Sequence, residues 1–263
     1  MSSKAKWFLI LTAFILNACK VDDPSGDLVI EVDDDFQLTM LEDLTTPEDD
    51  LHFKFESIRS KACDQDTVLI DLDNFGTALI MNINVQSTAS NCQVTDQKAV
   101  TQTLSGELTQ DNVSVSIKFT NVVANQGNLL LDNDSYELKM ETSYGFYVAY
   151  ETLRKVPRNS IWGYIGFTPN LSNIAQSLIQ DIEDQSSSID LTSGNYGYFD
   201  VSADKDIKIL DQEQEVVSTR PFVRNYGTVA DLQVITSIIQ DYKERYPNLR
   251  LNIRDSFGNI IAE

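Results

Sequence analysis

Short runs of alternating apolar and polar residues fill most of the chain between about residue 28 and residue 167. The clearest is 113–119, where Val, Val, Ile and Phe alternate with Ser, Ser and Lys. A period of two is typical of a β-strand buried on one face. Similar runs occur at 51–58, 67–72, 79–85, 136–140, 146–150 and 161–167, and turns are expected at 126–128 and 132–135. These runs predict a mainly β fold with an N-terminal β-sandwich, immunoglobulin-like or similar, over 51–167.

The pattern changes after Thr168-Pro169. Apolar residues recur at helical spacing from Leu171 to Ile182. A second helix is expected from Thr228, as N-cap, to about Arg245, ahead of Pro247. Further strands are expected at 197–201, 207–210, 216–223 and 249–254. Residues 168–263 are therefore predicted to form a small α+β unit with two amphipathic helices, either as a separate domain or packed on the sandwich.

The first residues have the layout of a secretory signal. Lys4 and Lys6 precede an apolar run from Trp7 to Leu16, and Ala18-Cys19 follows. The run is about half as long as a membrane-spanning helix requires and has no basic stop-transfer flank. We therefore expect residues 1–18 to be a signal peptide that is removed, with a retained membrane anchor as the alternative.

The segment Leu16-Asn17-Ala18-Cys19 resembles the lipobox of bacterial lipoproteins. Lys20-Val21-Asp22-Asp23 is similar to the tag that sends such proteins to the cell surface in Bacteroidota. The resemblance implies that Cys19 becomes an acylated N-terminus, that the protein contacts the membrane through this lipid, and that it is surface-exposed on the outer membrane. It covers only the N-terminal segment, and the rest of the chain shows no motif of a characterised family.

The chain is strongly acidic, with a formal net charge of −20 that becomes −22 if Lys4 and Lys6 are removed with the signal peptide. Such a charge is repelled by phosphate backbones, so nucleic acid is excluded as a partner. Residues 19–50 are predicted to form an acidic tether and the first strands. Calcium binding at 33–35 or 48–50 is the alternative for this segment, but no spacing matches an EF-hand loop and no metal site is assigned.

The cysteines and the single histidine limit the chemistry further. Once Cys19 is set aside, Cys63 and Cys92 remain, and in an oxidising compartment such a pair predicts a disulfide. The only histidine, His52, lies in an alternating run and is expected on the polar face of a strand. Zinc sites with several His and Cys ligands are excluded, and no nucleotide-binding or hydrolase motif is present. No catalytic residue and no cofactor is therefore assigned.

Three groups of residues are candidates for binding. Trp162 and Tyr164 are two apart on an expected strand and share a face, which favours core packing, with a ligand platform as the candidate binding role. The basic run 154–158 is conspicuous in an acidic chain and is either a solvated turn or a site for an acidic partner. A third group of arginines would line one sheet face if their strands have the right register. Its members are Arg220, Arg224, Arg250 and Arg254.

The leading functional hypothesis is a non-enzymatic binding or accessory role in the cell envelope, with a polysaccharide or an envelope protein as partner. A carboxylate-dependent glycoside hydrolase is the first alternative, because it needs only an Asp/Glu pair and the chain has 40 acids. A pilin-like structural subunit is the second alternative. Its maturation would require a cut after a basic residue, and after Lys20 the first basic residues are Lys54 and Arg59.

Overall fold

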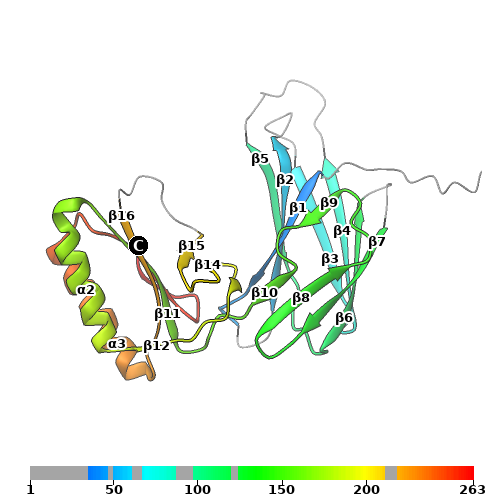
Figure 1. Ribbon diagram of the computed structural model, residues 1–263. Coiled ribbons are helices and arrows are strands. Elements are labelled where there is room, and N and C mark those ends of the chain that lie inside the picture. Colours follow the sequence, from blue (N-terminus) through cyan, green and yellow to red (C-terminus); the bar gives the residue numbers. More distant parts are fainter. Residues whose placement is uncertain (1–34, 47–49, 61–66, 87–96, 120–123, 211–217) are drawn as a thin grey trace, which may run out of the picture. The chain divides into compact units, whose positions relative to one another are not determined.

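The computed structural model describes residues 35–46, 50–60, 67–86, 97–119, 124–210 and 218–263. Its described part is mainly β, with three sheets and few helices (Figure 1). Within these residues, no helix is long and apolar enough to cross a membrane. The described residues belong to one compact unit, residues 33–263.

The first sheet has four strands in the order β5-β2-β1-β9. They are β1 (Phe36–Glu42), β2 (Leu51–Ser60), β5 (Lys98–Leu104) and β9 (Phe146–Val148). β2 pairs antiparallel with β1 and β5, whereas β9 pairs parallel with β1. Buried and partly exposed residues alternate along β1 and over the first six residues of β2, as expected for a sheet with one core face.

The second sheet has nine strands in the order β15-β14-β13-β10-β8-β7-β6-β4-β3. Five come from the first part of the chain: β3 (Thr67–Asn74), β4 (Ala78–Gln86), β6 (Asn112–Phe119), β7 (Ala124–Leu131) and β8 (Ser135–Met140). The others are short: β10 (Thr152–Arg154), β13 (Gly194–Asn195), β14 (Phe199–Val201) and β15 (Ile207–Ile209). A parallel pairing of Leu153 with Asn195 joins β10 to β13 and so brings the 189–196 segment beside β10.

One expected turn is wrong. Residues 126–128 lie in the middle of β7, and Gly127 pairs with Val115 on one side and Met140 on the other. A Cβ at Gly127 would lie 2.5 Å from the Lys139 carbonyl oxygen. The glycine is there because two backbones approach closely, not because the chain turns. The expected turn at 132–135 is confirmed, and the Asp132 amide donates to the Ser135 carbonyl there.

Buried residues from the first sheet and from strands β3 to β8 belong to one hydrophobic cluster. Phe53 and Phe55 of β2 share it with Val113, Val115 and Ile117 of β6, and all five are fully buried. The apolar face predicted for 113–119 is therefore confirmed as a core face. Full burial of a side chain of this size contributes about 1.5–3 kcal/mol.

The third sheet is antiparallel, in the order β12-β16-β11-β17-β18. Its strands are β11 (Ser160–Phe167), β12 (Ser187–Ser188), β16 (Ser218–Asn225), β17 (Arg250–Asp255) and β18 (Ile260–Ala262). Helices α2 (Ser172–Asp184) and α3 (Val229–Arg245) lie against one face (Figure 1), and the short 3-10 helix η1 (Pro169–Leu171) precedes α2. Both amphipathic patterns are confirmed, because Leu178 and Ile182 of α2 and Ile235 and Ile239 of α3 are buried there.

The start of α3 follows the predicted signal. Thr228 is its N-cap, and its side-chain oxygen accepts a hydrogen bond from the Asp231 amide, while the Asp231 carboxylate accepts one from the Thr228 amide. This reciprocal capping box satisfies two amides that have no partner inside the helix. The helix ends at Arg245, two residues before Pro247.

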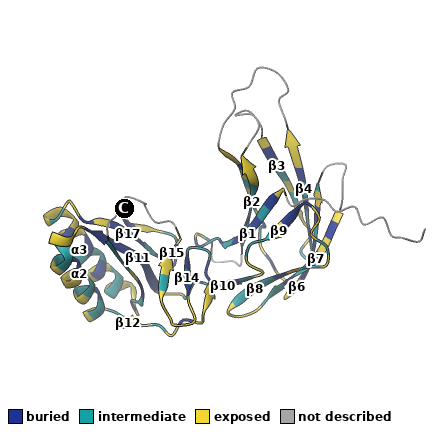
Figure 2. Cartoon of the chain, turned by 45° about the horizontal axis from the view of Figure 1, so that its top comes forward, coloured by how far each residue is buried: buried dark blue, intermediate teal, exposed yellow. Residues whose placement is uncertain are grey.

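Every residue of β11 is buried (Figure 2), because both faces of this central strand are covered. Ile161 and Ile165 point into the cluster shared with the helices. Trp162 and Tyr164 point into a third cluster, which also contains Leu44, from the connection after β1, and Phe199 of β14. The boundary between a domain over 51–167 and one over 168–263 stays a prediction.

Candidate functional site

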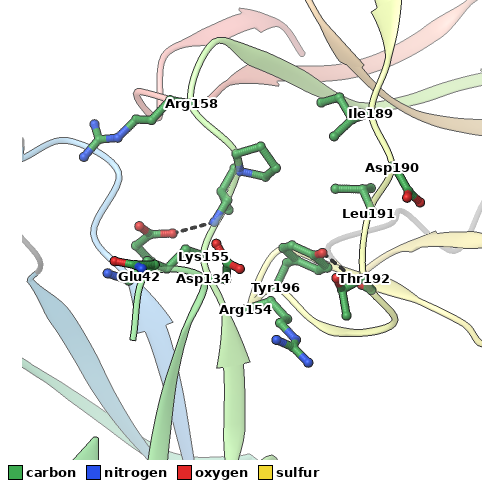
Figure 3. A pocket seen from close by; sticks show the side chains of 13 residues that line it. Glu42, Asp134, Arg154, Lys155, Arg158, Ile189, Asp190, Leu191, Thr192 and Tyr196 are labelled. Atoms are coloured by element: carbon green, nitrogen blue, oxygen red, sulfur yellow. Dashed lines mark hydrogen bonds between the residues drawn. The ribbon is translucent and has the colours of Figure 1, made fainter. Parts of the chain in front are cut away.

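A hollow of about 440 Å³ opens beside the end of β10 (Figure 3). We call it the Arg154 hollow. It is lined by Glu42, Asn133, Asp134, residues 154–158, residues 189–192 and Tyr196. The basic run singled out in the sequence thus forms one side of the hollow.

Hydrogen bonds from neighbouring strands fix the backbone of this basic run. The Val156 amide donates to Oε2 of Glu42 at 2.8 Å, and the Glu42 side chain is buried at the end of β1. The Lys155 amide donates to the Asp134 carbonyl at 2.9 Å, directly after the pairing of Arg154 with Ser135. Neighbouring strands therefore fix the backbone at Lys155 and Val156, and the expected solvated turn falls at the end of the run, where Arg158 is exposed.

Arg154 is half-buried against the opposite wall. A Cβ placed on Gly194 would lie 3.3 Å from Cγ and 3.5 Å from Nε of Arg154, and the backbone φ of Gly194 is +144°. Nε of Arg154 is buried and has no hydrogen-bond partner among the described residues. A buried donor without a partner is costly, so this guanidinium is held in place at some expense in stability.

Tyr196 forms an aromatic wall of the hollow and is only 4% exposed. Its hydroxyl donates to the Thr192 carbonyl at 2.9 Å, and burial, opposed in part by the nearby charge of Arg154, raises its pKa. Its ring stacks on Phe199 with centroids 4.7 Å apart, and Phe199 in turn contacts Trp162 at 5.7 Å. The wall is therefore supported from behind by the third core cluster.

The 189–192 segment is held by Lys205. Nζ of Lys205 donates to the Leu191 carbonyl at 2.5 Å and lies 3.2 Å from Oδ1 of Asp190. Leu191 itself is buried in the third core cluster. This side of the hollow is thus anchored by a buried side chain and a charge-assisted hydrogen bond.

The structure buries both residues of the expected ligand platform. Trp162 and Tyr164 are each 2% exposed. The Trp162 ring lies 5.1 Å from Tyr198 and 5.7 Å from Phe199, so its surroundings are side chains rather than solvent. This is the core packing that the sequence favoured, and we base no ligand contact on these two rings.

The expected grouping of four arginines on one sheet face is wrong. Arg220 and Arg224 pair with Ile165 and Ile161, whose side chains face the helices. Arg254 pairs with Trp162 and Arg250 with Gly166, which places both on the opposite face. Side chains directly opposite each other in a sheet point the same way, so the register separates the four into two pairs.

Several expected residues lie outside the described part of the chain. These are Cys19, both members of the expected disulfide, Cys63 and Cys92, and the acidic triplet 48–50 except for Asp50. His52 is described, on the outward face of β2 with its side chain 27% exposed, and Nε2 lies 3.6 Å from Oδ2 of Asp43. Within the described ranges, no group of three or more His, Cys, Asp or Glu side chains is arranged to hold a metal ion.

Sequence reasoning found the basic run but missed the residues opposite it. Glu42, Asp134, the 189–192 segment and Tyr196 come from three other stretches of chain. The glycines at 194 and 197 around Asn195-Tyr196 were the available signal, because they mark a tight backbone path there. Comparison with protein-family models, with curated proteins and with solved structures found no match to this chain.

Proposed function

We propose that the chain is a cell-envelope lipoprotein, attached to the outer membrane through acylated Cys19 and exposed at the cell surface, and that it binds a ligand without chemical turnover. The lipobox-like segment supports the anchor. The proposal includes a β-sandwich over 51–167, an α+β unit over 168–263 with two amphipathic helices, and a disulfide between Cys63 and Cys92. Two acyl chains suffice for stable attachment, so the folded part needs no membrane-binding surface of its own.

The Arg154 hollow is the observation that carries the binding role. Three basic side chains, Arg154, Lys155 and Arg158, and three acidic ones line it, whereas the whole chain has 20 basic and 40 acidic residues. Basic side chains are therefore concentrated at the hollow. Arginine recognises carboxylate, sulfate or phosphate groups through two parallel hydrogen bonds. We infer that the ligand carries an anionic group.

Two of the three acidic lining residues, Glu42 and Asp190, make contacts with other parts of the protein. The buried Glu42 carboxylate accepts the hydrogen bond from the Val156 amide. Asp190 pairs with Lys205, and its side chain is 96% exposed and points away from the hollow (Figure 3). These contacts support a binding site rather than a pair of catalytic carboxylates, so we do not propose the glycoside hydrolase.

The pilin-like alternative is not proposed either. Lys54 and Arg59 both lie within β2, which pairs with β1 and β5. A cut after either residue would divide a strand that is hydrogen-bonded on both sides. Such a cut would remove core residues of the first sheet instead of freeing a groove.

Native gel electrophoresis of the full chain in detergent tests the binding role. Gels containing a polysaccharide with glucuronate side groups should retard the chain, and gels containing neutral dextran should not. Arg154→Gln should abolish the retardation, whereas Arg245→Gln, at the exposed end of α3, should leave it unchanged. Equal migration of the wild-type chain in both gels would count against this function.

The anchor has a separate test. Mass spectrometry of the protein isolated from its native membrane should find an N-terminal peptide that begins at Cys19 and carries acyl chains. An unmodified peptide that still contains residues 1–18 would refute the lipoprotein assignment without affecting the Arg154 hollow.

A further inference from the structure

A second hollow, of about 490 Å³, lies next to the Arg154 hollow, and we call it the Gln110 hollow. The two share Asn133 and Lys155 as lining residues, so they meet at the turn between β7 and β8. Lys155 is held at this junction with Nζ 4.7 Å from the ring centroid of Tyr136. A ligand long enough to occupy both hollows would pass over this lysine.

The lining of the Gln110 hollow differs from that of the Arg154 hollow. Five of its eight lining residues carry hydroxyl, amide or carboxylate groups: Thr109, Gln110, Asp111, Asp132 and Asn133. Lys155 is its only basic lining residue. Carboxylates and amide oxygens accept hydrogen bonds from hydroxyl groups, whereas they repel an anion. The Gln110 hollow therefore suits a neutral, hydroxyl-rich sugar unit.

The net charge of −20 restricts the ligand further. A polymer with an anion on every unit would meet repulsion from the acids along the Gln110 hollow and from the protein as a whole. A ligand with a single carboxylate feels mainly the charges within about 8 Å, the Debye length at physiological salt. The Arg154 hollow is lined by two arginines and a lysine, and by three acids, of which Asp190 points away from the hollow.

We propose that the two hollows form one binding track for an oligosaccharide in which an acidic sugar sits in the Arg154 hollow and a neutral sugar sits in the Gln110 hollow. This inference rests on the proposed function and names its ligand class. Lys155 contacts both units at the junction. The carboxylate is recognised by Arg154, and the hydroxyl groups of the neutral sugar by the amide and carboxylate groups of the second hollow.

Isothermal titration of the full chain in detergent with three probes tests the track: glucuronic acid, cellobiuronic acid (glucuronic acid linked to glucose) and cellobiose. Cellobiuronic acid should bind at least about tenfold more tightly than either other probe, because it alone offers an acidic sugar to the Arg154 hollow and a neutral sugar to the Gln110 hollow. A tenfold change in affinity is about the loss expected from one good hydrogen bond.

Substitutions in each hollow test which sugar unit that hollow binds. Gln110→Ala should weaken binding of cellobiuronic acid about tenfold and leave glucuronic acid within about twofold, since it removes one hydrogen-bonding side chain from the second hollow only. Arg154→Gln should weaken both acids. Lys139→Gln, which removes an exposed lysine of β8 paired with Glu137, is the matched control for charge and should change neither.

The outcomes separate the two proposals. If neither acid binds in the millimolar range, both the proposed function and the track are wrong. If glucuronic acid and cellobiuronic acid bind equally and Gln110→Ala has no effect, the Arg154 hollow is an anion site and the track alone is wrong. If cellobiose binds as tightly as cellobiuronic acid, the assignment of the acidic sugar is wrong.

Discussion

Replacement of Trp162 by alanine is the sharpest test of how the Arg154 hollow is supported. The ring is 2% exposed and contacts Tyr198 and Phe199 in the third core cluster. Truncation of a buried aromatic side chain to alanine costs about 3–5 kcal/mol, because it removes buried area and leaves a cavity. Trp162→Ala should therefore lower the urea midpoint by an amount equivalent to this loss, measured by far-ultraviolet circular dichroism.

Trp162→Phe should behave differently for a second physical reason. Nε1 of Trp162 is buried without a hydrogen-bond partner in the described part of the chain. Its removal relieves an unsatisfied donor, about 1–3 kcal/mol, which offsets most of the lost contact area. We expect this variant to lie within about 1 kcal/mol of the wild type. Both substitutions remove the Nε1 donor. The difference between their free energies of unfolding therefore measures the packing of an aromatic ring at this position.

Tyr150→Ala is the matched control, because that ring is 44% exposed and its loss should change stability by less than about 0.5 kcal/mol. In a Trp7→Phe background Trp162 is the only tryptophan, and acrylamide should quench its fluorescence poorly. A Trp162→Ala cost as small as that of Tyr150→Ala, or ready quenching, would refute the burial and restore the ligand platform as a candidate.

Four further predictions concern other parts of the fold. Thr228→Ala removes the capping box of α3 and should lower the free energy of unfolding in urea by about 0.5–2 kcal/mol. Gly127→Ala forces a Cβ against a carbonyl of β8 and should lower the free energy of unfolding by about 1–3 kcal/mol, with faster amide exchange in β7. The Lys98 ammonium lowers the pKa of Glu56 below its ordinary 4.5. The ionised Glu56 carboxylate therefore stabilises the fold above pH 4.5, and this stabilisation is lost as the pH falls through the lowered pKa. In Glu56→Gln the melting temperature should fall less steeply as the pH is lowered over this range. Burial raises the pKa of Tyr198 from 10.0 to about 12, so its contribution is complete below pH 10 and fades as the pH rises toward 12, which absorbance titration against Tyr198→Phe will detect.

Local patterns were sufficient where a segment carries its own signal. The run 113–119 became β6 because alternation alone fixes its buried face, and α3 began at Thr228 because a capping residue needs only its own helix. Strand β5 was missed, since its outward residues include Val100 and Leu104 and its buried face is weakly apolar. Gly127 was misassigned because the reason for the glycine is the close backbone of the next strand, β8, and the alternation within β7 does not reveal this approach.

The Arg154 hollow shows the same division between local and distant information. The basic run is visible in the sequence, but its opposite wall depends on the single pairing of Leu153 with Asn195, which are 42 positions apart. The four-arginine hypothesis failed for the same reason, because register decides which side chains share a face. The acidic composition made the basic run conspicuous, but it could not indicate which residues lie opposite.

The way the Arg154 hollow is built favours recognition over turnover. Its aromatic wall is one ring of a stack that continues from Tyr196 through Phe199 to Trp162, so the wall cannot move without disturbing a core cluster. Its basic side is tied to β1 through Glu42, and its third side is tied down by Lys205. A site fixed on three sides loses little entropy when it binds, which raises its affinity for a ligand.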